Sequence, residues 1–313
     1  MNAILMGRRL TTVTAEFEGA SAHEYKDAGR KRYLIFSDVH GNYDALKNVL
    51  RKMDDGKYDH IICLGDVVGY GAEPVRCFEA LRDRCTGSDT SSHEAVQHRR
   101  IELIIGNHEA MLFGEESADG CSELGRISVA WTAEQCRKRI LRDVFSDSIR
   151  YRDMFFCHTG EMPDKGRWAY LNDREDIVRA FGDRREKFVF YGHTHRMRLT
   201  VLDQSGTIRE DRQIMRSEDI VIPKESQDRY LINTGSVGQA RDTITDCGYV
   251  EFEENDEQYI LHFIREKYQT FRAYRKIVKY GCGERTAQYM IREYSKKKWY
   301  RFWGCLLHWW NRS

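Results

Sequence analysis

The sequence lacks the usual features of a secreted or membrane-spanning chain. Its 9 cysteines are scattered and odd in number, and no Cys-x-x-Cys pair occurs, which argues against a disulfide framework. No run of about 18 apolar residues is present to cross a bilayer, and the first residues lack the apolar segment of a secretory signal. We therefore expect a cytoplasmic protein in a reducing compartment.

The chain of 313 residues, 41% of them hydrophobic and 32% charged, can bury one large core without covalent cross-links. Residues 1–31 show no clear periodicity, and we expect a leader that adds an edge strand or stays disordered. Residues 32–264 are predicted to form the main domain, and residues 265–313 a C-terminal extension.

Five short polar blocks each follow an apolar run that predicts a buried strand. The runs are Tyr33–Phe36, His60–Leu64, Ile101–Ile105, Met154–Cys157 and Phe188–Tyr191. In the same order, the blocks are Asp38-Val39-His40, Gly65-Asp66, Gly106-Asn107-His108-Glu109, His158 and Gly192-His193-Thr194-His195. Because ligands bind beyond the carboxyl ends of the strands in an open α/β sheet, we expect these separate blocks to form one site.

The residue types in these blocks predict a centre for two divalent metal ions. Two cations about 3.5–4 Å apart need a shared carboxylate to offset their repulsion, and Asp66 is the natural bridge. Each metal would take three further ligands: Asp38, His40 and His195 for one, and Asn107, His158 and His193 for the other. Imidazole with carboxylate suits manganese first, then iron or zinc, whereas magnesium prefers oxygen ligands alone.

Between the strands, apolar residues recur at helical spacing, which predicts an α/β fold. Helices are expected over residues 42–51, 74–81, 128–140 and 175–181. Short strands are expected later, over Met197–Val201, Tyr230–Ile232, Gly248–Phe252 and Tyr259–Phe263. Two polar inserts, residues 83–100 and 205–228, are predicted to be loops at least in part, and surface segments rather than a lid over the site.

Several further residues are candidates for substrate binding. The late Gly-Ser-Val-Gly turn would bring the backbone N–H groups of Gly235 and Ser236 close to the metals, where they suit a phosphate oxygen. Arg241 would add a charged donor, unless it only pairs with a neighbouring acid. Asn42 and Tyr70 lie in turns next to the ligands, and they either touch the substrate or shape the loop.

The blocks as a set resemble the calcineurin-like metallophosphoesterase family. Gly65–Gly71, the Trp131-Thr132 pair and Asn233–Asp242 are similar to a bacterial single-domain branch that includes YfcE-like phosphodiesterases and diadenosine-tetraphosphatase-like enzymes. The resemblance extends from Tyr33 to Phe263 and implies a four-layer αββα sandwich, in which two packed sheets are flanked by helices. It also implies that His108 is a protonated imidazole facing the leaving group, with Glu109 beside it as an orienting partner.

This chain departs from that family pattern at a few places. Thr234 replaces the usual proline, and Thr159-Gly160-Glu161 replaces Gly-Ser-Pro after the lone histidine. Neither departure touches a predicted metal ligand, so both bear on the substrate pocket rather than on the reaction type. Gly69-Tyr70-Gly71 stands where the protein serine/threonine phosphatases carry an arginine, which argues against a phosphoprotein substrate.

The C-terminal extension is predicted to be a basic, aromatic helical arm. From Arg265 to Ser313 it carries thirteen Lys or Arg against three Glu, a net +10 in a chain whose total is +1. Trp299, Trp303, Leu306 and Trp310 would share one helical face. Three roles stay open for the arm: docking on the body or forming a homo-oligomer seam, lying on an anionic membrane surface, or guiding nucleic acid or a polyphosphate substrate.

We therefore expect a metal-dependent phosphoester hydrolase, either a phosphodiesterase or a nucleotide pyrophosphohydrolase, that acts on a small phosphoester or nucleotide. A hydroxide bridging the metals would attack phosphorus, and His108 would protonate the departing oxygen as general acid. The alternatives are a phosphomonoesterase or phosphoprotein phosphatase, and a non-catalytic scaffold of the same fold. Ligands would be missing from a scaffold, and every expected ligand is present in this sequence.

Overall fold

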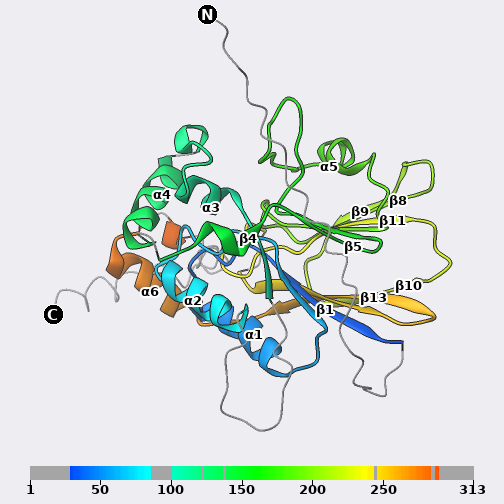
Figure 1. The fold of residues 1–313 in the computed structure, drawn as a ribbon, viewed down its shortest axis with the longest axis horizontal. Helices are drawn as coiled ribbons and strands as arrows, with labels where there is room; N and C mark the ends of the chain where they lie inside the picture. The colour runs from blue at the N-terminus through cyan, green and yellow to red at the C-terminus, as the bar shows by residue number, and fades with distance from the viewer. Residues whose placement is uncertain are drawn as a thin grey trace, which may run out of the picture.

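The computed structural model in Figure 1 describes residues 29–85, 101–121, 123–136, 139–242, 245–282 and 286–288. Most of the predicted leader, most of the insert at residues 83–100 and the tryptophans of the predicted C-terminal arm lie outside these residues. Among the helices of the described chain, none is long and apolar enough to cross a membrane.

The described helices are α1 (Tyr43–Asp54), α2 (Pro74–Cys85), α3 (Asn107–Leu112), α4 (Glu123–Cys136), α5 (Arg174–Phe181) and α6 (Thr270–Tyr280). The strands form two sheets. The seven-stranded sheet has the order β10 (Glu218–Pro223), β13 (Gln258–Glu266), β12 (Cys247–Glu254), β1 (Lys31–Phe36), β2 (His60–Cys63), β3 (Ile101–Ile104) and β4 (Phe145–Ser146). The six-stranded sheet has the order β5 (Ile149–Tyr151), β6 (Met154–Phe156), β7 (Phe188–Tyr191), β11 (Arg229–Asn233), β8 (Arg198–Leu202) and β9 (Ile208–Gln213).

The alternation of side chains along β1 shows how the layers are built. Tyr33 and Ile35 belong to the core between the two sheets, which also takes side chains from β6, β7 and β11. Leu34 and Phe36 point the other way, into a second core under α1 and α2. On the far side of the six-stranded sheet, α5 packs through Phe181 into a third core (Figure 1). The four-layer αββα sandwich is therefore confirmed.

The strand directions explain why the polar blocks meet. β1, β2 and β3 run parallel to one another, and so do β6 and β7, so the blocks that follow them leave each sheet at one edge. Within a sheet, the Asp38 N–H donates to the Gly65 carbonyl oxygen at 3.0 Å. The two sheets are joined at the same edge, because the Gly238 N–H that follows β11 donates to the Asp38 carbonyl oxygen at 3.0 Å.

The predicted strands and helices of the core are confirmed, with small shifts at their ends; the largest is in α4, which begins at Glu123 rather than at residue 128. Residues 205–228 differ more, because much of this insert forms β9 and β10 instead of loop. Both are edge strands of their sheets. Edge strands carry charge and need little apolar surface, so the alternation that reveals a buried strand is absent. Asp211 of β9, for example, accepts from Arg198 Nε at 2.7 Å.

The described part of the C-terminal extension begins with α6, which packs on α1 and on the loop before α2 (Figure 1). Lys276 of α6 lies with its Nζ 2.7 Å from Asp44 Oδ2, and it also pairs with Glu73. Ile277 is buried against Trp131 of α4. The first helix after the predicted domain boundary is thus attached to the body next to the loops that carry the site.

Candidate metal centre

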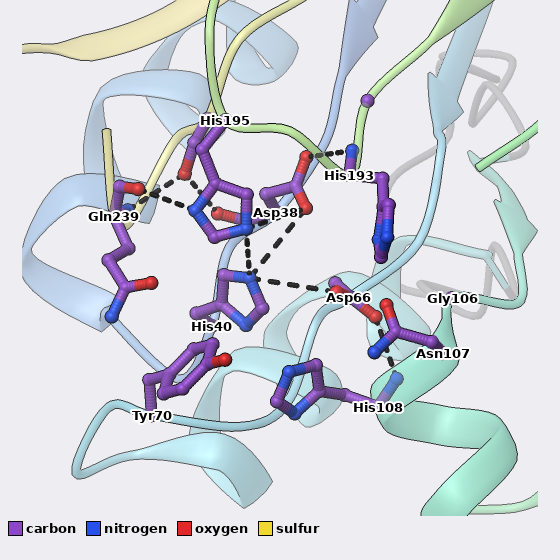
Figure 2. A network of polar contacts seen from close by, with 12 residues as sticks. Asp38, His40, Asp66, Tyr70, Gly106, Asn107, His108, His193, His195 and Gln239 are labelled. Carbon is purple, nitrogen blue, oxygen red and sulfur yellow. Dashed lines mark hydrogen bonds and ion pairs between the residues drawn. The ribbon is translucent and has the colours of Figure 1, made fainter. Parts of the chain in front are cut away.

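Two groups of buried side chains at the strand exits could each hold a cation. In the first, ligand atoms of Asp38, His40, Asp66 and His195 lie within 4.8 Å of one another (Figure 2). In the second, ligand atoms of Asp66, His158 and His193 do the same. Asp66 belongs to both groups, which is the position required of a bridging carboxylate.

The two oxygens of Asp66 have different tasks. Its Oδ1 accepts from the His108 N–H at 2.9 Å, which fixes the carboxylate against the start of α3. Its Oδ2 lies 3.6 Å from His40 Nε2 and 3.4 Å from His158 Nε2. A single oxygen atom therefore lies between an imidazole of the first group and an imidazole of the second.

Asp38 is arranged in the same way. Its Oδ2 accepts from the His193 N–H at 3.0 Å, whereas its Oδ1 lies 3.3 Å from His195 Nε2 and is buried without a hydrogen-bond partner. Asn107 lies beside the second group, with its Oδ1 3.2 Å from His158 Nε2. The structure thus brings together every residue that the sequence suggested as a metal ligand.

Three of the four imidazoles are oriented by backbone carbonyl groups, which accept from Nδ1 and leave Nε2 to face the other ligands. The pairs are His40 with Val68, His158 with Leu64 and His195 with Gln239, at 3.0, 2.9 and 2.6 Å. A carbonyl oxygen can only accept, so the partner assigns the proton to Nδ1. Metal-binding histidines are commonly fixed by such a bond.

The imidazole nitrogens and carboxylate oxygens that face one another here are ligand atoms suited to manganese, iron or zinc. Once Nδ1 of His40, His158 and His195 carries the proton, their Nε2 atoms and the carboxylate oxygens are all acceptors, and these side chains are buried together. Such a cluster is unfavourable unless a cation or a proton lies among its members. His193 faces this cluster through Nδ1, which lies 3.1 Å from His158 Nε2, and its Nε2 is buried without a hydrogen-bond partner.

The backbone is strained at the same residues. Of the seven non-glycine residues with positive φ in the described chain, six lie at this site: Asp38, His40, Asp66, Tyr70, His193 and His195. Such conformations cost about 1–3 kcal/mol each and cluster at functional sites. The backbone also approaches closely, since a Cβ atom at Gly106 would lie 2.1 Å from Asp66 Oδ1.

In the metal-free protein, electrostatics place a proton on His158. Burial by itself would lower the pKa of His158, but the Asp66 carboxylate raises it to about 9. Burial would likewise raise the pKa of Asp66, yet the charge of His158 holds it well below its usual range. Burial, and then the charge of His158, keeps the pKa of His193 well below its usual value. A cation bound here would displace the His158 proton, so metal affinity should depend on pH.

His108 lies next to the ligands, beside Tyr70 and His40 (Figure 2). Its ring centroid is 4.9 Å from that of His40 and 4.7 Å from that of Tyr70, and its Nδ1 is buried without a hydrogen-bond partner. Burial lowers the pKa of His108 to about 3, so the ring is neutral in the metal-free protein near pH 7. The protonated imidazole implied by the family resemblance therefore requires that a bound phosphate raise the pKa of this ring.

The family resemblance implied that Glu109 orients His108, but the Glu109 carboxylate has other partners in the structure. Its carboxylate accepts from the backbone N–H groups of Asp66, Val68 and Gly106 at 2.8, 2.9 and 3.0 Å. Neighbouring residues on a helix point in different directions, so the side chains of residues 108 and 109 of α3 do not face each other. Glu109 instead fixes the loop that carries the bridging Asp66.

In the turn that was expected to offer backbone N–H groups to a phosphate, the Gly235 N–H and the Ser236 hydroxyl have partners within the protein. The Gly235 N–H donates to Asn233 Oδ1 at 3.0 Å. Ser236 lies buried, and its Oγ donates to the Asp38 carbonyl oxygen at 2.8 Å. The next residue of the turn, Val237, donates its N–H to the Ser37 carbonyl oxygen at the exit of β1, at 3.0 Å. Ser236 therefore helps to position Asp38, and Gly235 is held by Asn233.

Asn42 is also occupied by the fold. Its Oδ1 accepts from the Ala45 N–H at 3.2 Å and caps α1, and its Nδ2 donates to the Gly238 carbonyl oxygen at 2.8 Å. These bonds leave the side chain 3% exposed. Of the two alternatives considered for Asn42, the structure supports the one in which it shapes the loop.

Arg241 reaches the site from the segment after β11. Its Nη2 donates to the Tyr70 hydroxyl at 3.3 Å and its Nη1 to the Tyr170 hydroxyl at 3.1 Å. Asp242, a candidate acid for Arg241, pairs with Arg265 instead. Tyr170 and its neighbour Trp168 were not suggested by the sequence, because no local pattern distinguishes them from other loop aromatics.

The fold and the site together define a metallophosphoesterase. Residues 32–256 match the model of the calcineurin-like phosphoesterase superfamily domain. The match spans more than half of the chain, so the protein belongs to the calcineurin-like phosphoesterase superfamily.

Three proteins show what the chain is similar to. A protein of Methanocaldococcus jannaschii, itself uncharacterised, is 31% identical over 253 residues, which cover 78% of this chain and 91% of that protein. A metallophosphoesterase from Sphaerobacter thermophilus, known from its crystal structure, is 27% identical with a TM-score of 0.62, covering 84% of this chain and 99% of that one. The E. coli phosphoesterase YfcE has 16% identity and a TM-score of 0.33 over 70% of this chain and 87% of its own. That last likeness is too low to carry an argument about the substrate.

Proposed function

We propose that the protein is a phosphoester hydrolase that works with two divalent cations, manganese being the first choice and iron or zinc the alternatives. The observation that supports this best is the position of Asp66 Oδ2, 3.6 Å from His40 Nε2 and 3.4 Å from His158 Nε2. One carboxylate oxygen shared by two groups of buried ligands is the arrangement that a pair of cations requires.

When bound, two such cations generate a nucleophile from water near neutral pH and offset the negative charge of the phosphoryl group. The protein residues hold this centre rigid, with Asp38 and Asp66 each fixed by a backbone N–H group. His108 lies beside the first group and would donate a proton to the departing oxygen. The negative charge of the substrate would raise the pKa of this ring from its low value in the metal-free protein.

The substrate we propose is a phosphodiester or a nucleotide with a pyrophosphate bond. In place of the arginine of the protein phosphatases, the loop at residues 69–71 presents the ring of Tyr70. The positive charge comes from Arg241, whose guanidinium carbon lies 5.6 Å from the centroid of that ring. A phosphomonoester or phosphoprotein substrate remains the alternative, and relative rates decide between them.

A non-catalytic scaffold is the alternative from another functional class. It would have no need to keep every ligand or to hold six site residues in strained backbone conformations. The cytoplasmic location and the roles proposed for the C-terminal arm, whether at an anionic membrane, with nucleic acid or in a homo-oligomer, remain predictions.

The experiment is a metal-supplemented assay of the purified, chelator-stripped protein. Manganese, iron(II), zinc and magnesium are tested with bis-p-nitrophenyl phosphate, p-nitrophenyl phosphate and a nucleotide panel, beside Asp66→Asn as the matched inactive variant. We expect metal-dependent hydrolysis of the diester that the variant lacks. Faster hydrolysis of the monoester would favour the phosphatase alternative. A protein that binds two equivalents of metal and hydrolyses nothing would favour the scaffold.

A further inference from the structure

The segment that follows His158 returns to the site and places two aromatic rings against its imidazoles. The Trp168 ring centroid lies 5.8 Å from that of His158, and the Tyr170 centroid lies 4.2 Å from that of His193. Ala169 between them is 1% exposed, and its carbonyl oxygen accepts from Thr159 Oγ1 at 2.8 Å. The anchored alanine thus lies between two residues whose rings both contact imidazoles of the centre.

Tyr170 differs from the other aromatic side chains at the centre in its exposure. It is 42% exposed, whereas Tyr70 on the other side of the site is 9% exposed. The Tyr170 ring therefore contacts a predicted metal ligand and still offers part of its surface to solvent. A planar group that entered the site from solvent would meet this ring directly above His193.

Arg241 connects the two tyrosines. Its guanidinium donates to both hydroxyl groups, and its centre lies 5.6 Å from the Tyr70 ring centroid and 6.0 Å from that of Tyr170. Gln239 Oε1 accepts a further bond from Nη2 at 3.3 Å, which fixes the plane of the guanidinium. The Arg241 backbone N–H donates to the His195 carbonyl oxygen at 3.1 Å, which places Arg241 next to the first group of ligands.

We propose that Tyr70, Arg241 and Tyr170, which we call the aromatic rim, bind the nucleoside monophosphate part of the substrate. The base stacks on the exposed face of Tyr170, and Arg241 contacts a phosphate oxygen. This inference rests on the proposed function and narrows its substrate class from phosphodiesters and nucleotides to nucleotides alone.

The chemistry of the rim favours a nucleotide over an alkyl phosphodiester or a phosphoprotein. An exposed aromatic face stacks on any nucleobase, whereas an alkyl group or a peptide side chain gains little from its planar shape. A guanidinium matches the geometry of phosphate oxygens. The Arg241 guanidinium donates to the Tyr170 hydroxyl at 3.1 Å. A ligand that contacts both side chains must therefore carry its planar group close to its phosphate.

The test compares two ligands that differ only in the base. Binding of adenosine monophosphate and of ribose 5-phosphate to the manganese-loaded protein is measured by isothermal titration calorimetry. We expect adenosine monophosphate to bind about 10-fold or more tightly, the scale of one stacked base. Tyr170→Leu should abolish this preference, whereas Tyr170→Phe should keep it, because the phenylalanine ring still stacks. Arg241→Gln should weaken both ligands by a similar factor.

Several results would contradict nucleotide binding by the aromatic rim. Equal affinity of the wild-type protein for the two ligands would do so without any variant, so the test survives a Tyr170→Leu protein that fails to fold. A preference that Tyr170→Leu retains, or that Tyr170→Phe loses, would also contradict stacking on this ring. Thermal unfolding and metal content are measured for each variant to show that the centre is intact.

The test separates this proposal from the proposed function, since calorimetry requires no turnover. A protein that prefers the nucleotide and hydrolyses no phosphoester would support nucleotide binding by the aromatic rim and contradict the proposed hydrolase activity. A protein that hydrolyses diesters and shows no preference for the base would support the hydrolase activity and contradict the role of the aromatic rim. If no manganese binds, the same two ligands are compared on the metal-free protein.

Discussion

His40 Nε2 and His195 Nε2 lie 3.0 Å apart, although the Nδ1 atom of each ring faces a backbone carbonyl oxygen. With the protons on Nδ1, the two Nε2 lone pairs face each other, and Asp38 Oδ1 lies 3.3 Å from His195 Nε2. Three buried acceptors at these distances repel one another. A cation bound among them would relieve this repulsion, so metal binding would stabilise the folded protein.

Removal of metal should therefore lower the stability of the protein as well as its activity. We expect the chelator-stripped protein to unfold at a lower temperature than the manganese-loaded one, by an amount that grows with the free manganese concentration. Differential scanning calorimetry at several manganese concentrations measures this. An unfolding temperature that does not change with manganese would contradict a centre that forms only in the folded protein.

Asp66→Asn should abolish the paired site. An asparagine keeps the shape and the Oδ1 bond from His108 N–H but removes the charge that two cations share. Loss of a residue that hydrogen-bonds to a metal ligand already lowers metal affinity or activity by about 10–100-fold. Loss of the ligand that both metals share should therefore cost more. Metal analysis after gel filtration decides the matter. A variant that retains two equivalents of manganese and near-normal turnover would show that Asp66 is not the bridge.

His108→Ala should separate metal binding from chemistry. We expect kcat to fall by about 10²–10⁴-fold, the usual contribution of a general acid, with both metals retained. The loss should be much smaller for a p-nitrophenyl ester than for an unactivated nucleotide ester, because p-nitrophenolate leaves without a proton. Equal losses on the two substrates would argue against the acid role.

Most of the metal centre could be predicted from the sequence, for a local reason. Each ligand follows its strand within a few residues, and parallel strands end at one edge of the sheet, so reading the strands also places the ligands. Asp66 and His158, which are far apart in the chain, meet at 3.4 Å in this way. No contact between the blocks had to be known in advance.

Tyr70 and Arg241 were candidates from the sequence, but Tyr170, the contacts within the aromatic rim and the bonds of Glu109 could not be predicted in this way. Tyr70 and Arg241 are separated by 171 positions, and their contact depends on how one loop of each sheet folds back. Glu109 stands next to His108 in sequence, but the helix turns its carboxylate towards the backbone of the Asp66 loop. Such contacts depend on side-chain directions and loop paths, for which the hydrophobic pattern holds no signal. The charged edge strand β9 was missed for a related reason.

The attachment of α6 should depend on Asp44. This carboxylate is 4% exposed and pairs with Lys276 and Lys47. Asp44→Asn should lower the free energy of unfolding by about 1.5–3 kcal/mol, the scale of hydrogen bonds to a charged group. Asp54→Asn at the other end of α1 is the matched control, since Asp54 is 61% exposed in its pair with Arg84 and should change stability by less than about 1 kcal/mol. Urea unfolding at pH 7 measures both.

The effect of Asp44→Asn should also depend on pH in a defined direction. Burial opposes the shift, but the bonds from Lys276 and Lys47 lower the pKa of Asp44 in the folded protein. A lowered carboxyl pKa gives stability above the unfolded value of about 3.9, and that stability is lost as the pH falls through the folded pKa. The difference between wild type and Asp44→Asn should therefore be largest from about pH 5 to 7 and shrink below about pH 4. A difference that grows as the pH falls would contradict this assignment.

Gly69→Ala should disable His108 without touching a metal ligand. A Cβ atom at Gly69 would lie 2.2 Å from His108 Nδ1, so the ring must move. We expect a loss of kcat of the order of that in His108→Ala, about 10²-fold or more, with both metals retained. Part of any effect comes from the backbone, because Gly69 has φ +92° and an alanine there costs about 1–2 kcal/mol.

Gly114→Ala provides the matched control for Gly69→Ala. Gly114 has φ +72° and no atom within 4 Å of the added Cβ, so this variant should lose stability and keep its kcat. Steady-state kinetics, metal analysis and thermal unfolding of the two variants distinguish displacement of His108 from backbone strain. Equal kcat in both variants would show that the position of the His108 ring does not limit the reaction.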